Sequence, residues 1–166
     1  MSIRKGIHYL LRAFAELNLP QAELLLVGPV SPEIEPFLHE YAGCYRYVAP
    51  QPQSRLSEFY GQSSVSVVMS LEEGMAMVIP QAMACGLPVI CTANTGGEDI
   101  VRENVDGFII PIRAVETLKE RLFYLYQNPE KCREMGTSAR ERVACGFSWD
   151  DYGDRIFGKY RDIIGE

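Results

Sequence analysis

The stretch VSVVMSLEEGMAMVIPQAMACGLPVICT, residues 65–92, decides the fold class because it contains two strand patterns separated by a helical one. Its first five residues are rich in β-branched side chains, which favour a strand. An apolar helical pattern then runs to Cys85 and ends at Gly86. The segment PVICT, residues 88–92, is a second strand pattern. This order favours a right-handed crossover between two parallel strands.

The same alternation continues on both sides of this stretch. Upstream, helical patterns at 5–18, 32–42 and 54–63 alternate with strand patterns at 22–28 and 45–49, and Ser54 is expected to cap the third helix. Downstream, a short helix at 97–104 and a strand at 107–111 are followed by helical patterns from Val115 to the end, with breaks near Asn128–Pro129 and Gly146. We therefore predict an α/β class with a single Rossmann-like domain: a parallel sheet of about five or six strands with helices on both faces.

The composition of the chain argues against several classes of function. The 166 residues fit one domain, and the formal net charge of −6, with dispersed basic residues, argues against binding to a nucleic-acid backbone. No apolar run approaches the ~20 residues of a membrane-spanning helix, and the start MSIRKG lacks the apolar core of a signal peptide. Five scattered cysteines and two histidines indicate a reduced, cytoplasmic protein without a metal site.

The loop at residues 70–75 is the first candidate for ligand binding, because ligands of such sheets lie beyond the carboxyl ends of the strands. Gly74 permits a close approach to the backbone, and the helix N-terminus that follows favours an anion. Glu72 and Glu73 are acceptors for vicinal hydroxyls, and Lys5 is a positive charge. Each feature alone is common: acids often occupy a first helical turn, and most lysines are solvated. Together they describe a nucleotide-sugar site.

The order of the motifs is more specific than any one of them. RKGIHYLLRAF, AELLLVG, LSEFYGQSSVSVVMS, EEGMAMVIPQAMACGLPVI, GGEDIV, DGFIIP and FSWDDY together resemble the C-terminal, donor-binding domain of family 4 glycosyltransferases, which have the GT-B fold. The resemblance covers nearly the whole chain. It implies that residues 1–166 form this domain without its N-terminal acceptor domain and without a first strand that ends in Gly-Arg in the family. Residues 147–166 correspond to the family's C-terminal helix.

The resemblance also implies roles for individual residues. Glu73 would bind the hydroxyls of the donor sugar, and Lys5 would bind the diphosphate and neutralise the leaving group. Gln81 would contact the ribose. The amides of the loop after Glu73 would contact the sugar and the phosphates, and the loop that starts at residue 49 would contact the base. The loop residues are Gly74, Met75, Ala76 and Met77, and the base-binding residues are Ala49, Pro50 and Gln51.

Four positions depart from the family's pattern. Gln81 replaces a glutamate and therefore lacks its charge-assisted hydrogen bond. Ala76 replaces a glycine, and Pro80 implies that the helix starts close to it or kinks there. The segment GGEDIV is one residue shorter than the family's motif, so Glu98 and Asp99 are both candidates for its acidic residue.

The implied activity is that of a retaining, hexosyltransferase-like enzyme. It would transfer a sugar from a UDP- or GDP-linked donor to an acceptor hydroxyl in glycan, polysaccharide or glycolipid biosynthesis, without a metal or other cofactor. The isolated chain is expected to be inactive, because an N-terminal acceptor domain or a partner chain would complete the cleft. Peripheral membrane contact of the intact enzyme stays open. The alternative is a non-catalytic nucleotide-sugar-binding module or subunit that needs a separate partner chain.

Overall fold

A computed structural model describes residues 1–165 and contains five strands among them, all parallel. They are β1 (Leu24–Val27), β2 (Tyr45–Val48), β3 (Ser66–Val68), β4 (Val89–Thr92) and β5 (Gly107–Ile110). The Rossmann-like α/β class and the parallel direction are confirmed. The strands are divided between two sheets, one of order β1-β2 and one of order β3-β4-β5.

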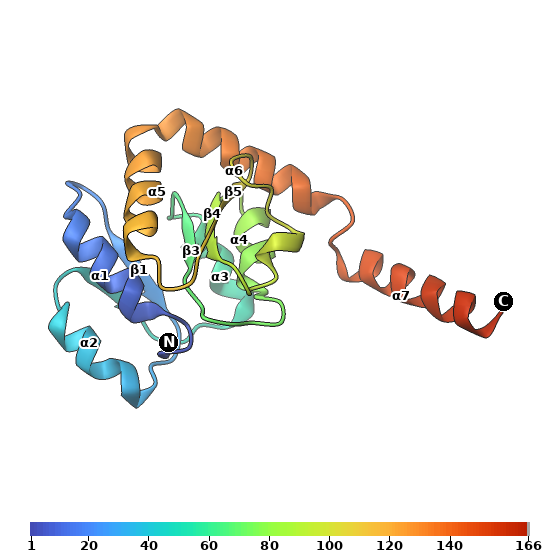
Figure 1. Cartoon of the computed structure of the whole chain (residues 1–166), viewed down its shortest axis with the longest axis horizontal. Helices are drawn as coiled ribbons and strands as arrows, with labels where there is room; N and C mark the ends of the chain where they lie inside the picture. Colours follow the sequence, from blue (N-terminus) through green and yellow to red (C-terminus); the bar gives the residue numbers. More distant parts are fainter. Residues whose placement is uncertain (166) are drawn as a thin grey trace.

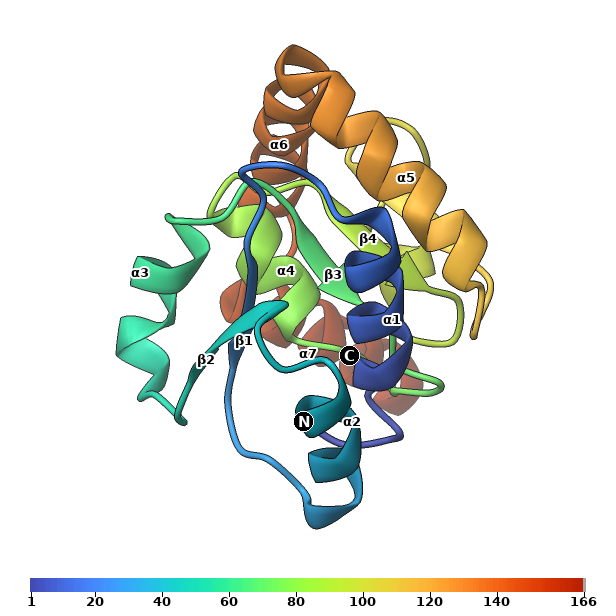
Figure 2. The ribbon, with the colours of Figure 1, turned by 90° about the vertical axis from the view of Figure 1, so that its left-hand side faces the viewer.

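Helices cover both faces of these strands, as predicted. The α-helices are α1 (Ile7–Leu17), α2 (Glu35–Glu40), α3 (Leu56–Tyr60), α4 (Val78–Ala84), α5 (Val115–Gln127), α6 (Pro129–Ala144) and α7 (Trp149–Ile164). Helices α1 and α5 lie together on one side, and α3 and α4 lie on the other (Figures 1 and 2). The predicted breaks near residues 128 and 146 are confirmed by the boundaries between α5, α6 and α7.

The core has two layers because successive side chains of a strand point to opposite faces. In the central strand β4, Ile90 joins a buried cluster with Leu11 of α1 and Leu118 of α5. The next residue, Cys91, joins a second cluster with Ile79 of α4. All four residues of β4 are buried.

The start of α4 differs from the sequence-based expectation. Glu72 and Glu73 lie in the loop before the helix rather than in its first turn, because α4 begins at Val78. Pro80 is therefore within the first turn, where its missing amide has no intrahelical partner to lose. The prediction that the helix starts close to this proline is confirmed.

Two other local predictions are wrong. Ser54 does not cap α3; it lies inside a 3-10 turn, Gln53–Arg55, that begins after Pro52. The expected helix at 97–104 is reduced to the 3-10 turn Gly97–Asp99. It ends early because the Arg102 amide donates to the Asp106 carboxylate at 3.1 Å instead of continuing a helix.

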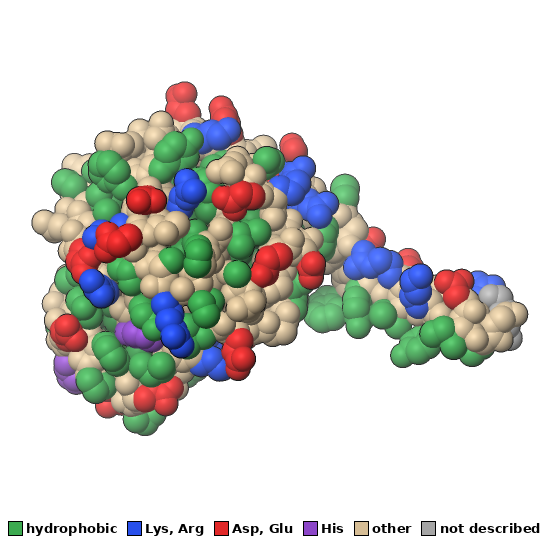
Figure 3. Space-filling view, in the orientation of Figure 1, with side chains coloured by type: hydrophobic (Ala, Val, Ile, Leu, Met, Phe, Trp, Pro, Cys, Tyr) green, Lys and Arg blue, Asp and Glu red, His purple; other side chains and the backbone are tan. Residues whose placement is uncertain are grey.

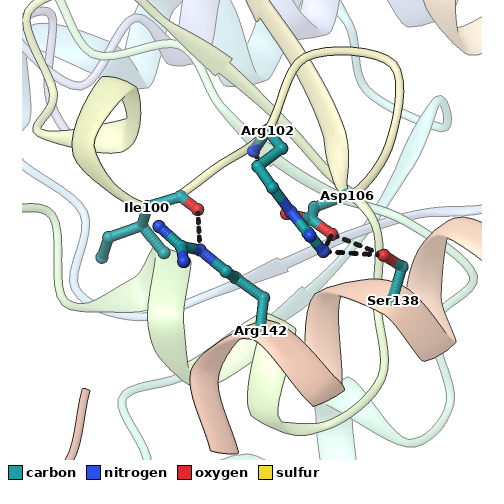
Figure 4. Close-up of polar contacts among 5 residues, drawn as sticks. All are labelled: Ile100, Arg102, Asp106, Ser138 and Arg142. Carbon is teal, nitrogen blue, oxygen red and sulfur yellow. Dashed lines mark hydrogen bonds and ion pairs between the residues drawn. The ribbon is translucent and has the colours of Figure 1, made fainter. Parts of the chain in front are cut away.

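A buried carboxylate fixes α6 to the loop before β5 (Figure 4). Asp106 is fully buried and accepts hydrogen bonds from Arg102 and Ser138, each at 2.8 Å. Arg142, one turn further along α6, donates to the Ile100 carbonyl at 3.2 Å. Burial alone would raise the pKa of Asp106, but the hydrogen bonds from Arg102 and Ser138 hold it below its ordinary value.

Helix α7 extends away from the rest of the chain, and hydrophobic side chains gather along one side of it (Figures 1 and 3). Its start is fixed by a capping box in which Ser148 and Asp151 each bind the other's backbone amide. The last residue of the predicted segment 147–166, Glu166, lies outside the described residues. Among the helices that the structure describes, none has both the length and the apolar character needed to cross a membrane. The exposed hydrophobic side chains of α7 are Trp149, Tyr152, Ile156, Phe157, Tyr160, Ile163 and Ile164.

Candidate functional site

The segment before α1 meets the carboxyl end of β3, and this contact creates the candidate site. The Leu71 amide donates to the Arg4 carbonyl at 2.9 Å. Gly6 has a φ of 66°, and a Cβ at this position would lie 1.8 Å from the carbonyl oxygen of Met69. Only glycine allows so close an approach with this backbone conformation. Lys5 is thereby held beside the loop that follows β3.

Two cations from this segment converge on Glu73. The Lys5 Nζ lies 2.6 Å from Glu73 Oε1, and the Arg4 Nη1 lies 3.4 Å from the same oxygen. Arg4 also donates to the Glu72 carbonyl at 3.1 Å. The Glu73 side chain is 13% exposed, and among residues 1–165 its Oε1 has no well-aligned hydrogen-bond donor. The Lys5 ammonium and the Arg4 guanidinium therefore hold this carboxylate by their charge.

The surroundings of Glu73 favour its ionised form. Burial alone would raise its pKa, but the Lys5 ammonium, Ser70 and the Arg4 guanidinium together hold the pKa below its ordinary value. At neutral pH the site therefore contains a carboxylate with two cations beside it. Such a group of charges can exchange partners with a ligand that carries both hydroxyls and an anion.

The loop after Glu73 is tied to the loop that follows β4. The Glu73 amide donates to the Asn94 carbonyl at 2.8 Å, and the Ala76 amide donates to the Thr95 carbonyl at 2.9 Å. Among the loop residues predicted to contact a ligand, the amides of Gly74, Met75 and Met77 make no hydrogen bond within residues 1–165. The loop thus presents three unbound amide donors on a fixed backbone, while that of Ala76 is occupied.

The second loop contains both candidates for the family's acidic residue, and their environments differ. Glu98 accepts a hydrogen bond from the Asn94 amide at 2.6 Å, and the hydrogen bond lowers its pKa. Asp99 is exposed. Gly96, with a φ of 73°, brings this loop close to residues 74–75: a Cβ on it would lie 2.9 Å from the Gly74 carbonyl oxygen.

The structure does not bring the other predicted residues into an ion pair or hydrogen bond with Lys5 or Glu73 among residues 1–165. Gln81 lines a cavity of about 210 Å³ between α3 and α4, together with Gln53 and Leu56, whereas Lys5 lines a different cavity. The predicted base-binding residues follow β2; Ala49 and Pro50 are exposed, and the Gln51 side chain donates to the Ala49 carbonyl at 3.0 Å.

Two parts of the site were not predicted from the sequence: Arg4 and the Asn94–Thr95 carbonyls. A signal for both was present. Arg4 directly precedes Lys5, and residues 93–97 follow a strand pattern next to β3 in the chain. The rule that the carboxyl ends of neighbouring parallel strands meet at one edge places the two loops side by side, but it was not applied to residues 93–97.

Metal ligands do not gather in the part of the chain that the structure describes: residues 1–165 contain no group of three His, Cys, Asp or Glu side chains able to hold an ion. The five cysteines are free thiols. The charged side chains at the candidate site are those of Arg4, Lys5 and Glu73, together with the neighbouring Glu72 and Glu98.

Comparison with known proteins identifies the family. Residues 1–142 match the family described as "Glycosyl transferases group 1". The chain belongs to the group 1 glycosyltransferases. A D-inositol 3-phosphate glycosyltransferase of Kribbella flavida is 32% identical over 116 residues, which are 70% of this chain and 27% of that protein.

Two solved structures of other proteins have the same fold. The sucrose-phosphate synthase of Thermosynechococcus elongatus superposes with a TM-score of 0.87 at 30% identity, over 99% of this chain and 43% of the other. Anabaena Alr3699/HepE, solved in complex with UDP and glucose, superposes with a TM-score of 0.86 at 19% identity, over 98% of this chain and 46% of the other. The chain thus spans less than half the length of these proteins.

Proposed function

We propose that this group 1 glycosyltransferase chain is the C-terminal, donor-binding half of a family 4 enzyme with retention of anomeric configuration. It would bind a nucleoside diphosphate sugar, UDP- or GDP-linked, and serve transfer of the sugar to an acceptor hydroxyl in glycan, polysaccharide or glycolipid synthesis in the cytoplasm. The observation that carries this proposal is the Lys5–Glu73 pair at 2.6 Å beside the free loop amides. The UDP complex of Alr3699/HepE supports the class of donor.

The pair suggests how a donor is bound. Without a ligand, Lys5 and Glu73 neutralise each other, and Arg4 adds a second positive charge. A diphosphate would attract the Lys5 ammonium, which leaves the Glu73 carboxylate free to accept hydrogen bonds from sugar hydroxyls. The amides of Gly74, Met75 and Met77 would complete the contacts to sugar and phosphate, with Ala76 holding the loop in place.

The same groups would act in transfer. As the bond between the sugar and the diphosphate breaks, negative charge grows on the leaving group, and a cation already in place stabilises it. Lys5 would supply that charge, which is an electrostatic role and not acid–base catalysis. Gln81 would contact the ribose, and Ala49 to Gln51 the base. An N-terminal acceptor-binding domain or a partner chain would complete the cleft, so we expect little or no turnover by the chain alone.

Calorimetric titration with UDP, GDP, ADP and their common sugar conjugates tests this proposal. We expect one nucleoside diphosphate to bind, and Lys5→Ala to weaken that binding at least tenfold. Glu73→Gln should abolish the additional affinity that the sugar provides, without weakening binding of the bare diphosphate, because the amide no longer competes for Lys5.

Lys131→Ala is a matched control, because this lysine pairs with Glu134 at 3.2 Å on the exposed surface of α6. Its titrations should equal those of the unmodified chain. If a folded chain binds none of these nucleotides, the proposed donor site is contradicted. Equal affinities of the Lys5→Ala and unmodified chains would contradict the role of the lysine.

A further inference from the structure

The Glu73 carboxylate has two cations beside one of its oxygens, and their distances differ. The Lys5 Nζ lies 2.6 Å from Oε1, whereas the Arg4 Nη1 lies 3.4 Å from it. Within residues 1–165 neither cation forms a well-aligned hydrogen bond with this oxygen, so charge rather than direction holds them there. A carboxylate oxygen has more than one lone pair and can accept from a second donor. The closer cation can therefore leave without depriving Glu73 of every partner.

Arg4 is fixed at this place more firmly than Lys5 is. Its carbonyl accepts the hydrogen bond from the Leu71 amide at 2.9 Å, and its Nη1 donates to the Glu72 carbonyl at 3.1 Å. The recorded ion-pair partner of the Lys5 ammonium is Glu73, and this ammonium ends a flexible four-carbon chain. A diphosphate that attracts Lys5 would therefore leave Arg4 where it is.

Glu73 needs a cation because water solvates it poorly. Its side chain is 13% exposed, while those of Arg4 and Lys5 are 53% and 42% exposed. Burial is the largest influence on the pKa of Glu73, and it raises that pKa. The Lys5 ammonium, Ser70 and the Arg4 guanidinium outweigh burial and hold the pKa below its ordinary value. When Lys5 turns to a ligand, the closest of these partners is lost.

The charged side chains on the neighbouring loops are acidic and cannot replace that partner. Glu72 precedes Glu73 in its own loop, and only its carbonyl contacts Arg4. The loop after β4 packs against Glu73 through the Asn94 carbonyl, and its Glu98 carboxylate accepts from the Asn94 amide at 2.6 Å. Both acids disfavour a further negative charge nearby. Arg4 is thus the cation that stays beside this carboxylate.

We propose that Arg4 is a positioning residue for Glu73: when the diphosphate of a donor draws Lys5 away, Arg4 becomes the counterion of the carboxylate and keeps it ionised and directed at the sugar. The inference rests on the proposed donor site and names the residue that maintains its sugar-binding group. The two cations then have separate tasks, because Lys5 serves the diphosphate and Arg4 serves the sugar. Substituting one or the other should therefore have different consequences.

The first test needs no ligand, because Lys5→Met imitates the departure of the ammonium. The pKa of Glu73 is measured from the NMR shift of its carboxyl carbon, assigned with Glu73→Gln, in chains that circular dichroism shows to be folded. We expect this pKa to be higher by at least about 0.5 in Lys5→Met/Arg4→Met than in Lys5→Met alone. Lys5→Met/Arg4→Lys should restore the lower value, since the second lysine keeps the charge.

Arg12→Met is the matched control for this titration. The Arg12 side chain is 55% exposed, much like that of Arg4, and it pairs with Glu16 at 2.7 Å within α1. Added to Lys5→Met, it should leave the pKa of Glu73 unchanged. If the pKa of Glu73 in Lys5→Met is the same with and without Arg4, the proposal is overturned.

The second test uses the nucleoside diphosphate that binds in the titrations above, together with its sugar conjugate. Arg4→Met should leave the affinity for the bare diphosphate within about twofold and reduce the additional affinity from the sugar at least about threefold. The reduction should be larger at pH 5 than at pH 7, because a carboxylate without a cation is protonated at a higher pH. Arg4→Lys should restore both the affinity and its pH dependence.

The contrary results separate this proposal from the donor site itself. If Arg4→Met weakens binding of the bare diphosphate as much as Lys5→Ala does, Arg4 binds the phosphates, and its role as the counterion of Glu73 is overturned. If the unmodified chain binds no nucleotide, the donor site is contradicted. The carboxyl titration still decides in that case whether Arg4 replaces Lys5 beside Glu73.

Discussion

The two sheets of this chain differ in how deeply their strands are buried. In the β3-β4-β5 sheet, all four residues of the central strand β4 are buried; in the β1-β2 sheet, burial alternates along β1 and no residue of β2 is buried. The difference follows from pairing, because β4 has a neighbour on each side and a helix layer on each face. The β1-β2 sheet has one ladder, and a cavity of about 1130 Å³ lies beside β1, between Leu24–Val27 and residues 65–70. The edge strand β5 has one neighbour and still has three buried residues, so burial reflects the helices that cover a strand as well as its neighbours.

The less buried sheet is held to the rest of the chain by contacts at both ends of α1. Near the carboxyl end of α1, Glu16 pairs with Lys119 of α5 at 2.8 Å. Before the helix begins, Lys5 pairs with Glu73 and Gly6 packs against Met69. The candidate site therefore lies on the boundary between the two regions. A ligand that binds there would contact both.

The largest expected effect comes from truncating one side chain in each sheet. Ile90→Ala removes a fully buried side chain of β4, so it should lower the free energy of unfolding by about 2–5 kcal/mol. Leu25→Ala, on the half-buried β1, should cost less than about 1.5 kcal/mol, because the neighbouring cavity already leaves part of this side chain without contacts. Urea unfolding of both variants measures the difference. Equal losses would show that the two sheets are packed equally well.

The contact between the two regions is tested by a glycine. Gly6→Ala places a Cβ 1.8 Å from the Met69 carbonyl oxygen, at a φ of 66° that disfavours alanine, so we expect a loss of about 1–3 kcal/mol in unfolding free energy. Because Lys5 would shift with the backbone, donor affinity should also fall. Gly153→Ala is the control, since a Cβ on this residue of α7 meets nothing within 4 Å and should change stability by no more than about 1 kcal/mol. Thermal unfolding and titration of both variants are the measurements.

Local patterns predicted the elements better than they predicted the ends of those elements. The strand patterns at 88–92 and 107–111 correspond to β4 and β5 because β-branched, apolar runs are a local property. The start of α4 depends on contacts with residues far away in the sequence. The Ala76 amide donates to Thr95 across the molecule, which keeps residues 72–77 out of the helix. Alternation of strands and helices likewise indicated one parallel sheet, whereas the five strands form two sheets because β1 and β3 do not pair.

For the candidate site, the sequence predicted the residue types but not their arrangement. Spacing along the chain gives no reason for Lys5 to contact Glu73, 68 positions away. The family resemblance implies that both lie at the donor, and in the structure their charged atoms are 2.6 Å apart. Arg4 was overlooked because an arginine beside a lysine at the start of a helix is ordinary in a sequence. Its proximity to Glu73 is a consequence of the Leu71–Arg4 backbone hydrogen bond, which only the folded chain forms.

The smallest expected effect is on the pH dependence of the free energy of unfolding. It is tested on two carboxylates with lowered pKa values. Asp106 lies within the better-packed region, whereas Glu73 links the two regions. A carboxylate with a lowered pKa in the folded state stabilises the fold above its ordinary pKa, and this contribution is lost as the pH falls through the lowered pKa. Asp106→Asn should cost about 1 kcal/mol at pH 7 and flatten the decline of stability below pH 4, because the buried side chain loses the negative charge that strengthens its hydrogen bonds from Arg102 and Ser138. Glu73→Gln should flatten it less, since the partners of this carboxylate, Arg4 and Lys5, are half exposed and already screened by solvent. Urea unfolding from pH 7 to pH 3 measures both slopes, and a larger change for Glu73→Gln would mean that the contact between the two regions, rather than the core of the larger sheet, determines acid stability.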